Sequence, residues 1–253
     1  MINDNFIFNL QDRIKVFNSL MMNVIITGAS KGIGKAIAAV FAAEGASLFL
    51  CARNEEPLNN TVTELIKQYP ASTIKWMSAD LSKKEEVIKF SNWCLPSGAP
   101  DILVNNAGQF IPGGICDEAD GNLEKMMAVN VYSAYHLTRA LLPAMIARKK
   151  GHIFNICSIA SLHAYANGGG YSISKFAMMG FSKNLRKELI SHQIKVTAVY
   201  PGAVMTDSWG DFDNSDKRIM EPEDIAIMVL AASKLSPQAV VEDIVLRPLL
   251  GDL

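Results

Sequence analysis

Short apolar runs alternate with segments of helical periodicity along most of the chain. The runs are rich in Val, Ile and Leu and lack a regular polar alternation, which is typical of parallel strands covered on both faces. They predict strands at residues 22–27, 46–52, 73–79, 102–105, 152–158, 195–200 and 240–246. The segments between them predict helices at 32–44, 55–69, 83–94, 123–148 and 170–191. This order predicts an α/β fold, a doubly wound parallel sheet of about seven strands with helices on both faces.

Residues 1–21 precede the first predicted strand and have a different pattern. Apolar residues recur there at helical spacing: Phe6, Leu10, Ile14, Phe17 and Met21. This spacing indicates a short amphipathic helix that docks on the domain or on a partner, or else a dispensable extension from an upstream start codon. The segment lacks the apolar core of a signal peptide and the arginine content of a mitochondrial presequence. We expect an extension at 1–21 and a single domain at 22–253.

Composition narrows the classes of protein that fit. The chain of 253 residues is 49% hydrophobic and 19% charged, which supplies a large core and excludes a disordered chain. A net charge of −1 argues against a general binder of nucleic acid or anionic membranes, and no apolar run approaches the roughly 20 residues of a membrane span. The four cysteines contain no Cys-x-x-Cys pair and indicate reduced thiols in a cytoplasmic protein.

Tyr171 and Lys175 form the most informative pair in the sequence. They are four residues apart on a predicted helix, so their side chains share one face, one turn apart. An ammonium group that close favours the phenolate and lowers the tyrosine pKa from its usual value of about 10, so that the phenol exchanges a proton near neutral pH. Ser158 lies thirteen residues before Tyr171 and ends a predicted strand, so its hydroxyl is expected at the carboxyl edge of the sheet.

Gly28, Gly32 and Gly34 lie between the first strand and the first helix, in the order Gly-x-x-x-Gly-x-Gly. Glycines here let the backbone turn sharply and approach a pyrophosphate, which then rests on the helix N-terminus. Such a turn can be purely structural, but the strand–turn–helix context favours a dinucleotide site. The second strand ends without the acid that binds ribose hydroxyls; Arg53 there and Lys31 in the turn can contact a 2′-phosphate. These cations favour NADP(H), unless both are merely solvated on the surface.

Together, the glycine turn, Ser158 and the Tyr171-x-x-x-Lys175 pair resemble the single-domain branch of the short-chain dehydrogenase/reductase family. The resemblance covers residues 22–247 and implies a Rossmann-type sandwich with a catalytic set of Asn130, Ser158, Tyr171 and Lys175. In the implied mechanism the cofactor gives a hydride to a carbonyl carbon, Ser158 and Tyr171 bind the carbonyl oxygen, and Tyr171 donates the proton. Lys175 would hold the nicotinamide ribose, and Asn130 would anchor a water that relays protons to it. Asn is a poor helix former, so local bonding or a kink is the alternative for Asn130.

The same resemblance implies further cofactor contacts. Asp80 matches the position that hydrogen-bonds the adenine, and Thr206 matches the position that contacts the nicotinamide carboxamide. Asn106, in the run Asn105-Asn106-Ala107-Gly108, is expected to hold the sheet together through backbone bonds. No metal is expected. The full expected cofactor set is Gly28, Ser30, Lys31, Gly32, Ile33, Gly34, Arg53, Asp80, Leu81, Asn106, Ala107, Gly108, Tyr171, Lys175, Pro201, Gly202, Val204 and Thr206.

Three stretches, 109–115, 159–170 and 205–220, are expected to border the substrate. They carry a mixed aromatic set that suits a small or ring-bearing ketone: Phe110, His163, Tyr165, Trp209 and Phe212. His163 and Tyr165 can also be plain surface residues. The segments 201–209 and 241–248 and the end of the chain are similar to bacterial sepiapterin-reductase-like members of the family.

Two alternatives remain open at this point. The basic run Arg148-Lys149-Lys150 suits a 3-oxoacyl-[acyl-carrier-protein] reductase, which needs a surface for an acidic carrier, although it can equally complement a helix dipole. A non-catalytic regulator that senses NADP(H) is the alternative from another class. The family resemblance also implies a homotetramer or homodimer, assembled through exposed apolar positions at 123–147 and 177–189.

Overall fold

The computed structural model describes residues 22–252, so the pattern expected at 1–21 lies outside the described residues. Seven parallel strands form one sheet in the order β3-β2-β1-β4-β5-β6-β7. Their bounds are β1 Asn23–Thr27, β2 Ser47–Ala52, β3 Thr73–Ser78, β4 Ile102–Asn105, β5 His152–Ile156, β6 Lys195–Pro201 and β7 Asp243–Leu246. The strand order reverses between β1 and β4, the topological switch point at which open α/β sheets bind their ligands. The predicted fold class is confirmed.

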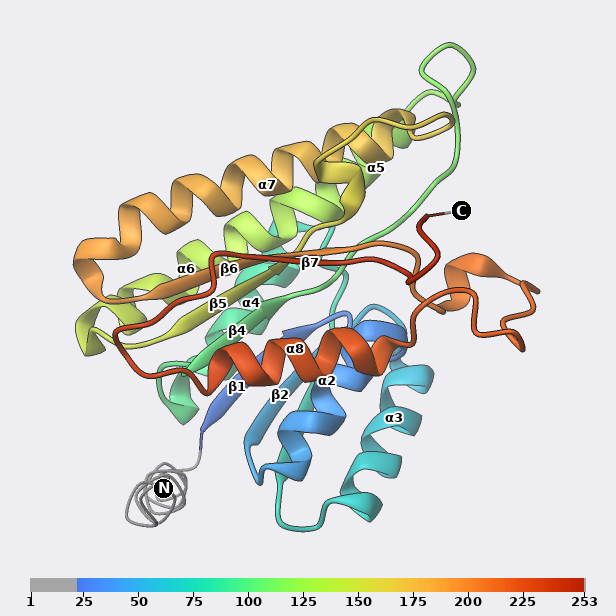
Figure 1. The fold of residues 1–253 in the computed structure, drawn as a ribbon. Helices are drawn as coiled ribbons and strands as arrows, with labels where there is room; N and C mark the ends of the chain where they lie inside the picture. Colours follow the sequence, from blue (N-terminus) through green and yellow to red (C-terminus); the bar gives the residue numbers. More distant parts are fainter. Residues whose placement is uncertain (1–21, 253) are drawn as a thin grey trace, which may run out of the picture.

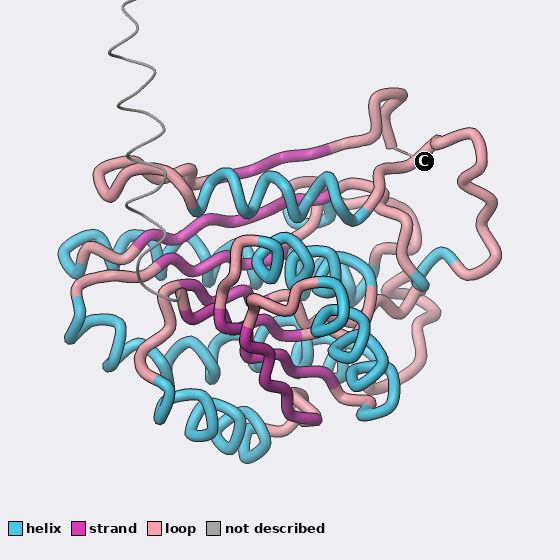
Figure 2. Tube along the Cα trace, turned by 90° about the horizontal axis from the view of Figure 1, so that it is seen from below, coloured by secondary structure: helices cyan, strands magenta, loops and turns pink. Residues whose placement is uncertain are grey.

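Helices cover both faces of the sheet (Figures 1 and 2). One face carries α2 Gly32–Ala43, α3 Glu55–Gln68 and α8 Pro222–Ser233. The other carries α4 Lys84–Cys94, α6 Ser133–Arg148 and α7 Gly169–Leu189, with the short α5 Asn122–Met127 beside α7. None of the helices in the described part of the chain is both long and apolar enough to cross a membrane.

Side chains of the strands contribute to two separate apolar cores, one on each face of the sheet, because successive side chains of a strand point to opposite faces. In β1, Val24 and Ile26 pack toward α2 and α8, whereas Ile25 packs toward α4 and α6. In β2, Leu48 and Leu50 join the first core and Phe49 joins the second. Each fully buried side chain of this size stabilises the fold by about 1.5–3 kcal/mol relative to its exposed state. The sheet is therefore a rigid base for the loops at its carboxyl edge.

Three elements differ from the prediction. Helix α8 was not predicted; its signals are Pro222 at the first helical position and a capping box between Glu221 and Asp224. The helix expected at 123–148 is divided by a π-helical turn, Ala128–Tyr132, between α5 and α6. The last strand begins at Asp243 rather than at residue 240.

Candidate active site

The residues expected at the site come after the carboxyl ends of six neighbouring strands. The glycine turn follows β1, Arg53 follows β2, Asp80 follows β3, Asn106 follows β4 and Ser158 follows β5. The segment from Pro201 to Thr206 continues from β6 and leads into the 205–220 segment, drawn in orange at this edge of the sheet in Figure 1. Parallel strands thus bring positions far apart in the sequence to one edge.

The turn after β1 is held by close backbone contacts. Gly28 and Gly32 have φ angles of +65° and +52°, a region that favours glycine. A Cβ atom at Gly34 would lie 2.2 Å from the Gly28 carbonyl oxygen and 2.5 Å from Asn106 Nδ2. Two other residues of the expected set are less free: Ser30 O accepts a hydrogen bond from Thr61, and Ile33 packs on the core. The turn therefore presents backbone rather than side chains to a ligand, which fits a pyrophosphate.

Asn106 ties this turn to the loop after β4. Its Nδ2 donates to the carbonyl oxygens of Thr27 and Gly28 at 2.9 and 3.0 Å. The backbone N–H groups of Asn106 and Ala107 both donate to Thr27 Oγ1, at 3.0 and 2.9 Å. The amide thus holds two strand ends together, which is the role expected from the sequence. Gly108 lies close to two further site residues: a Cβ there would be 3.5 Å from Asn130 Oδ1 and 3.7 Å from Lys175 Nζ.

The structure brings Ser158, Tyr171 and Lys175 together. Ser158 lies two residues beyond the end of β5, and its Oγ accepts a hydrogen bond from the Ala160 N–H at 3.1 Å. Tyr171 and Lys175 lie on α7, and Lys175 Nζ is 5.7 Å from the centre of the Tyr171 ring. Lys175 Nζ is buried and donates to Ile156 O at 3.0 Å. Lys175 is therefore fixed beside the Tyr171 ring.

The acidity of this pair differs from the sequence expectation. Burial raises the pKa of the Tyr171 phenol, although the Ser158 hydroxyl acts in the opposite direction. Burial likewise lowers the pKa of Lys175. The expected lowering of the Tyr171 pKa is not seen in this arrangement, because burial of the phenol outweighs the hydrogen bond with Ser158. Tyr171 is a neutral phenol at neutral pH, the protonation state of a proton donor.

Asn130 is buried in the π-helical turn and has no bond to Lys175. Its Oδ1 accepts the Gln109 N–H at 2.7 Å, and its Nδ2 donates to Gln109 O at 3.0 Å and to Ser174 Oγ at 2.8 Å. Ser174 Oγ in turn donates to Tyr171 O at 2.7 Å. The loop after β4, the π turn and α7 are thus locked together. Sequence reasoning placed Gln109 only in a stretch expected to border the substrate and missed Ser174, because the contacts of both with Asn130 depend on the tertiary fold.

Two charged residues after β2 and β3 lie at the adenosine end of the expected cofactor site. Arg53 is exposed, and Ser78 Oγ donates to its carbonyl oxygen. Burial alone would raise the pKa of Asp80, but hydrogen bonds from Ser82 and the charges of Lys83 and Arg53 outweigh it and lower that pKa. Asp80 is thereby held as a carboxylate. Leu81, also in the expected set, packs into the core instead.

The segment after β6 is anchored before it reaches the site. The Gly202 N–H donates to Leu246 O at 2.7 Å, and Val204 is buried and forms a bridge with Met220. Thr206 Oγ1 shares a hydrogen bond of 2.7 Å with Ser208 Oγ. The residues around the edge fit a dinucleotide: backbone at the turn, cations at one end, and Thr206 and Lys175 at the other. No cluster of metal-binding side chains occurs within residues 22–252.

Of the aromatic residues expected near the substrate, Phe110 contacts Tyr171, the expected proton donor. The rings of Phe110 and Tyr171 are 4.9 Å apart in an edge-on arrangement, and Phe110 is 40% exposed. Tyr165 is half exposed, and burial raises its pKa to about 12. The ring centres of Trp209 and Phe212 are 5.2 Å apart. His163 is exposed. Glu118, missed from the sequence, accepts the Gly170 N–H at 3.2 Å and so supports the start of α7.

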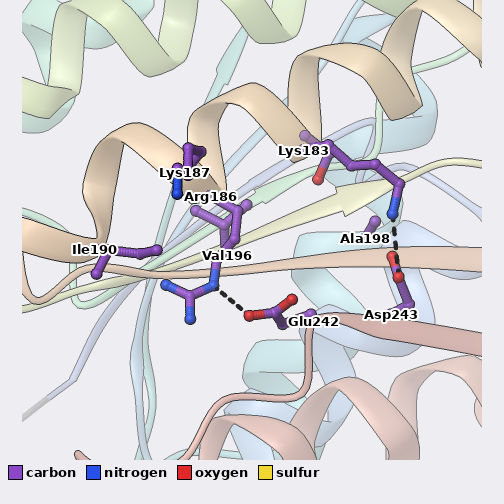
Figure 3. A pocket seen from close by; sticks show the side chains of 9 residues that line it. Lys183, Arg186, Lys187, Ile190, Val196, Ala198, Glu242 and Asp243 are labelled. Atoms are coloured by element: carbon purple, nitrogen blue, oxygen red, sulfur yellow. Dashed lines mark hydrogen bonds and ion pairs between the residues drawn. The ribbon is translucent and has the colours of Figure 1, made fainter.

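A surface hollow of 280 Å³ lies elsewhere, between α7 and β7 (Figure 3). Lys183 and Asp243 pair across it at 3.2 Å, and Arg186 and Glu242 pair at 2.9 Å. None of the expected site residues lines it. Its charges are used in joining the last strand to α7, so it does not compete with the sheet edge as the candidate active site.

Comparison with known proteins agrees with this geometry. The sequence matches the short chain dehydrogenase family over residues 22–217. An uncharacterized oxidoreductase of Staphylococcus aureus strain MRSA252 is 33% identical over 225 residues, which cover 88% of this chain and 96% of the relative. The chain therefore belongs to the short-chain dehydrogenase/reductase family, and its expected class, an oxidoreductase, is confirmed.

Two solved structures extend the comparison. A metagenomic short-chain oxidoreductase in complex with NADP is 33% identical, with a TM-score of 0.78 over 90% of this chain and 96% of that one. L-Sorbose reductase from Gluconobacter frateurii, complexed with NADPH and L-sorbose, is 29% identical, with a TM-score of 0.81 over 89% and 95%. Both neighbours carry the phosphorylated nicotinamide cofactor.

Proposed function

We propose that this protein is an NADP(H)-dependent carbonyl reductase that interconverts a small or ring-bearing ketone and its secondary alcohol. The observation that carries the proposal is the convergence of Ser158, Tyr171 and Lys175 beside Phe110 at the carboxyl edge of the sheet. The cofactor is NADP(H), supported by Arg53 and Lys31 at the adenosine end and by the NADP-bound neighbours. A pteridine ketone of the sepiapterin type is the first candidate substrate.

The chain's own groups supply binding and a proton. When bound, NADPH supplies the hydride that reduces the carbonyl carbon. The hydroxyls of Ser158 and Tyr171 donate hydrogen bonds to the carbonyl oxygen, where negative charge develops. Because burial raises the pKa of the Tyr171 phenol, it is protonated at neutral pH and delivers its proton to that oxygen. Lys175, fixed by Ile156 O, stands beside the tyrosinate that results and is placed to hold the nicotinamide ribose.

The test is NADPH oxidation with a panel of ketones and aldehydes that includes a pteridine ketone, an aryl diketone and a keto sugar. Tyr171→Phe is expected to abolish nearly all turnover while leaving NADPH affinity within about twofold, because only the proton donor is lost. Ser158→Ala retains the phenol and should leave a larger residual rate. A Tyr171→Phe variant with a near-normal rate would refute the assignment of the proton donor.

Reduction of an acyl-carrier-protein thioester is the less favoured function. Arg148 and Lys150 both pair with the carboxylate of Asp101, at 2.7 and 3.0 Å, so these cations are already engaged. They also precede β5 and lie at the amino edge of the sheet, opposite the catalytic edge. Specificity constants for a pteridine ketone and an acetoacetyl thioester decide between the two. A tenfold advantage of the thioester, about 1.4 kcal/mol, would favour the carrier-protein function.

A sensing role without catalysis is the remaining alternative. It predicts tight NADPH binding and no oxidation of any compound in the panel. The convergence of Ser158, Tyr171 and Lys175, with Asn130 held by hydrogen bonds beside them, favours an enzyme over a non-catalytic sensor.

Assembly into a dimer or tetramer is part of the same proposal. Large apolar side chains are exposed at the end of the π turn (Tyr132), at the start of α6 (Tyr135) and along α7 (Ile173 and Phe176). Burying such a face against a second copy removes apolar surface from water. Light scattering should give a mass of two or four chains; a monomer at all concentrations would contradict it.

A further inference from the structure

An ion pair crosses the expected cofactor edge. Lys31 Nζ, in the glycine turn, lies 2.5 Å from Asp207 Oδ2, in the segment after β6. Beside the pair, the two parts of the chain touch: a Cβ atom at Gly32 would lie 3.1 Å from Thr206 Cγ2. The segment carrying the expected nicotinamide contact therefore rests on the turn carrying one of the two expected phosphate contacts.

The cations around this edge are not equivalent. Within residues 22–252, Arg53 makes no ion pair, and its charge acts only at a distance on Asp80. Lys35, one turn further along α2, pairs with Glu64. Lys31, the other expected contact of the 2′-phosphate, therefore differs from Arg53, because its charge is already paired with Asp207. Nothing in the sequence indicates this, since the two residues are 176 positions apart.

We infer that Asp207 determines cofactor specificity by competing with the 2′-phosphate of NADP(H) for Lys31, and so lowers the preference for NADP(H) over NAD(H). This inference rests on the proposed NADP(H) function. A phosphate dianion bound by Arg53 draws the Lys31 ammonium toward itself and away from the carboxylate. NAD(H) has a hydroxyl at that position and leaves the ion pair intact.

The competition also links two ends of the cofactor site. A ligand that weakens the Lys31–Asp207 ion pair removes one contact that holds the 205–220 segment against the glycine turn. By reciprocity, breaking this ion pair raises the affinity of Lys31 for the phosphate. Both side chains are more than 60% exposed, at 62% and 63%, so the pair is a weak one. The expected change in affinity is accordingly about two- to fivefold, which is the range of an exposed ion pair.

The test is binding to Asp207→Asn, which removes the charge and keeps the shape. We expect NADPH and adenosine 2′,5′-bisphosphate to bind about two- to fivefold more tightly at low ionic strength, with NADH and 5′-ADP unchanged. Fluorescence titration measures the reduced cofactors and calorimetry measures the two fragments. Asp211→Asn, which removes an exposed acid from the same segment, is the matched control and should change none of the four affinities.

A double-mutant cycle identifies the partner. Lys31→Met should weaken NADPH binding, and Asp207→Asn in that background should have no further effect. The inference would be overturned if Asp207→Asn bound NADPH and NADH more tightly to the same extent, or if it bound NADPH more weakly. It would also be overturned if Asp207→Asn still changed NADPH affinity in the Lys31→Met background. Failure of the unmodified protein to bind NADPH at all would refute the proposed function instead, so the two failures are distinguishable.

Discussion

Replacement of Gly34 by alanine tests the tight turn that we assign to the cofactor. The new Cβ would lie 2.2 Å from the Gly28 carbonyl oxygen, which belongs to the backbone and cannot rotate away. It would also lie 2.5 Å from Asn106 Nδ2 and so displace the amide that bonds Thr27 O and Gly28 O. Both the shape of the turn and its brace are therefore disturbed.

The magnitude combines opposing contributions. Alanine gains about 1 kcal/mol over glycine in a helix. Overpacking costs about 1–3 kcal/mol, and the two displaced hydrogen bonds cost about 1 kcal/mol each. The net loss in the free energy of unfolding is about 2–4 kcal/mol, and each kcal/mol lowers Tm by about 2–4 °C in a chain of this size. Loss of one charge-assisted backbone contact to the pyrophosphate adds roughly a tenfold to hundredfold loss in NADPH affinity.

Gly180→Ala supplies the matched control. Gly180 also lies within a helix, but a Cβ there meets nothing within 4 Å. Its replacement should therefore raise the free energy of unfolding by about 0.5–1 kcal/mol and leave NADPH affinity unchanged. Urea unfolding and fluorescence titration measure both variants. A Gly34→Ala protein as stable as Gly180→Ala, with NADPH affinity within twofold of the unmodified protein, would refute the argument.

Three further predictions concern the charge of Arg53, the pH dependence of stability and the hydrogen bonds of Asn130. Arg53→Ala should weaken NADPH binding about ten- to hundredfold and spare NADH, because a charge-assisted phosphate contact is lost; equal losses for both cofactors in titrations would contradict this. Burial lowers the pKa of His152 to about 3, below its unfolded value of 6.5, so stability is full above pH 6.5 and falls as pH drops toward 3. Urea unfolding should show a loss of roughly 1–2 kcal/mol between pH 7.5 and 5.5, reduced in His152→Gln but not in the exposed control His163→Gln. Asn130→Ala should lower kcat more than NADPH affinity, because it removes the hydrogen bonds that hold the Gln109 backbone and Ser174 beside Tyr171. Unchanged steady-state kinetics would show that these hydrogen bonds do not position Tyr171.

The fold was predictable because five of its seven strands, β1, β2, β4, β5 and β6, are buried on both faces and therefore form continuous apolar runs in the sequence. Helix α8 was not predicted because it comes after the irregular 205–220 segment, although Pro222 and the Glu221–Asp224 capping box mark its start. The π turn escaped because helical periodicity does not show where a single residue has been added.

Placement of the site was predictable for a similar reason. Side chains just beyond the ends of parallel strands meet at one edge, so Ser158, Tyr171 and Lys175 come together once the strands are assigned. Their electrostatics were not predictable, since the sequence shows the Tyr171–Lys175 spacing but not the burial that dominates the pKa of each. The Lys31–Asp207 pair likewise depends on how the segment after β6 folds back across the edge.

The π turn at Ala128–Tyr132 also sets how this protein tolerates changes in length. An extra residue in a helix rotates the part before it by about 100° relative to the part after it, at 3.6 residues per turn. Deleting one residue here would leave Leu137 and Leu141 in their core but turn Met126 of α5 out of its buried position. It would also carry Asn130 away from the Gln109 backbone. The spacing between these two packed faces is therefore a fixed count of residues, and variation in chain length is confined to the loops on either side.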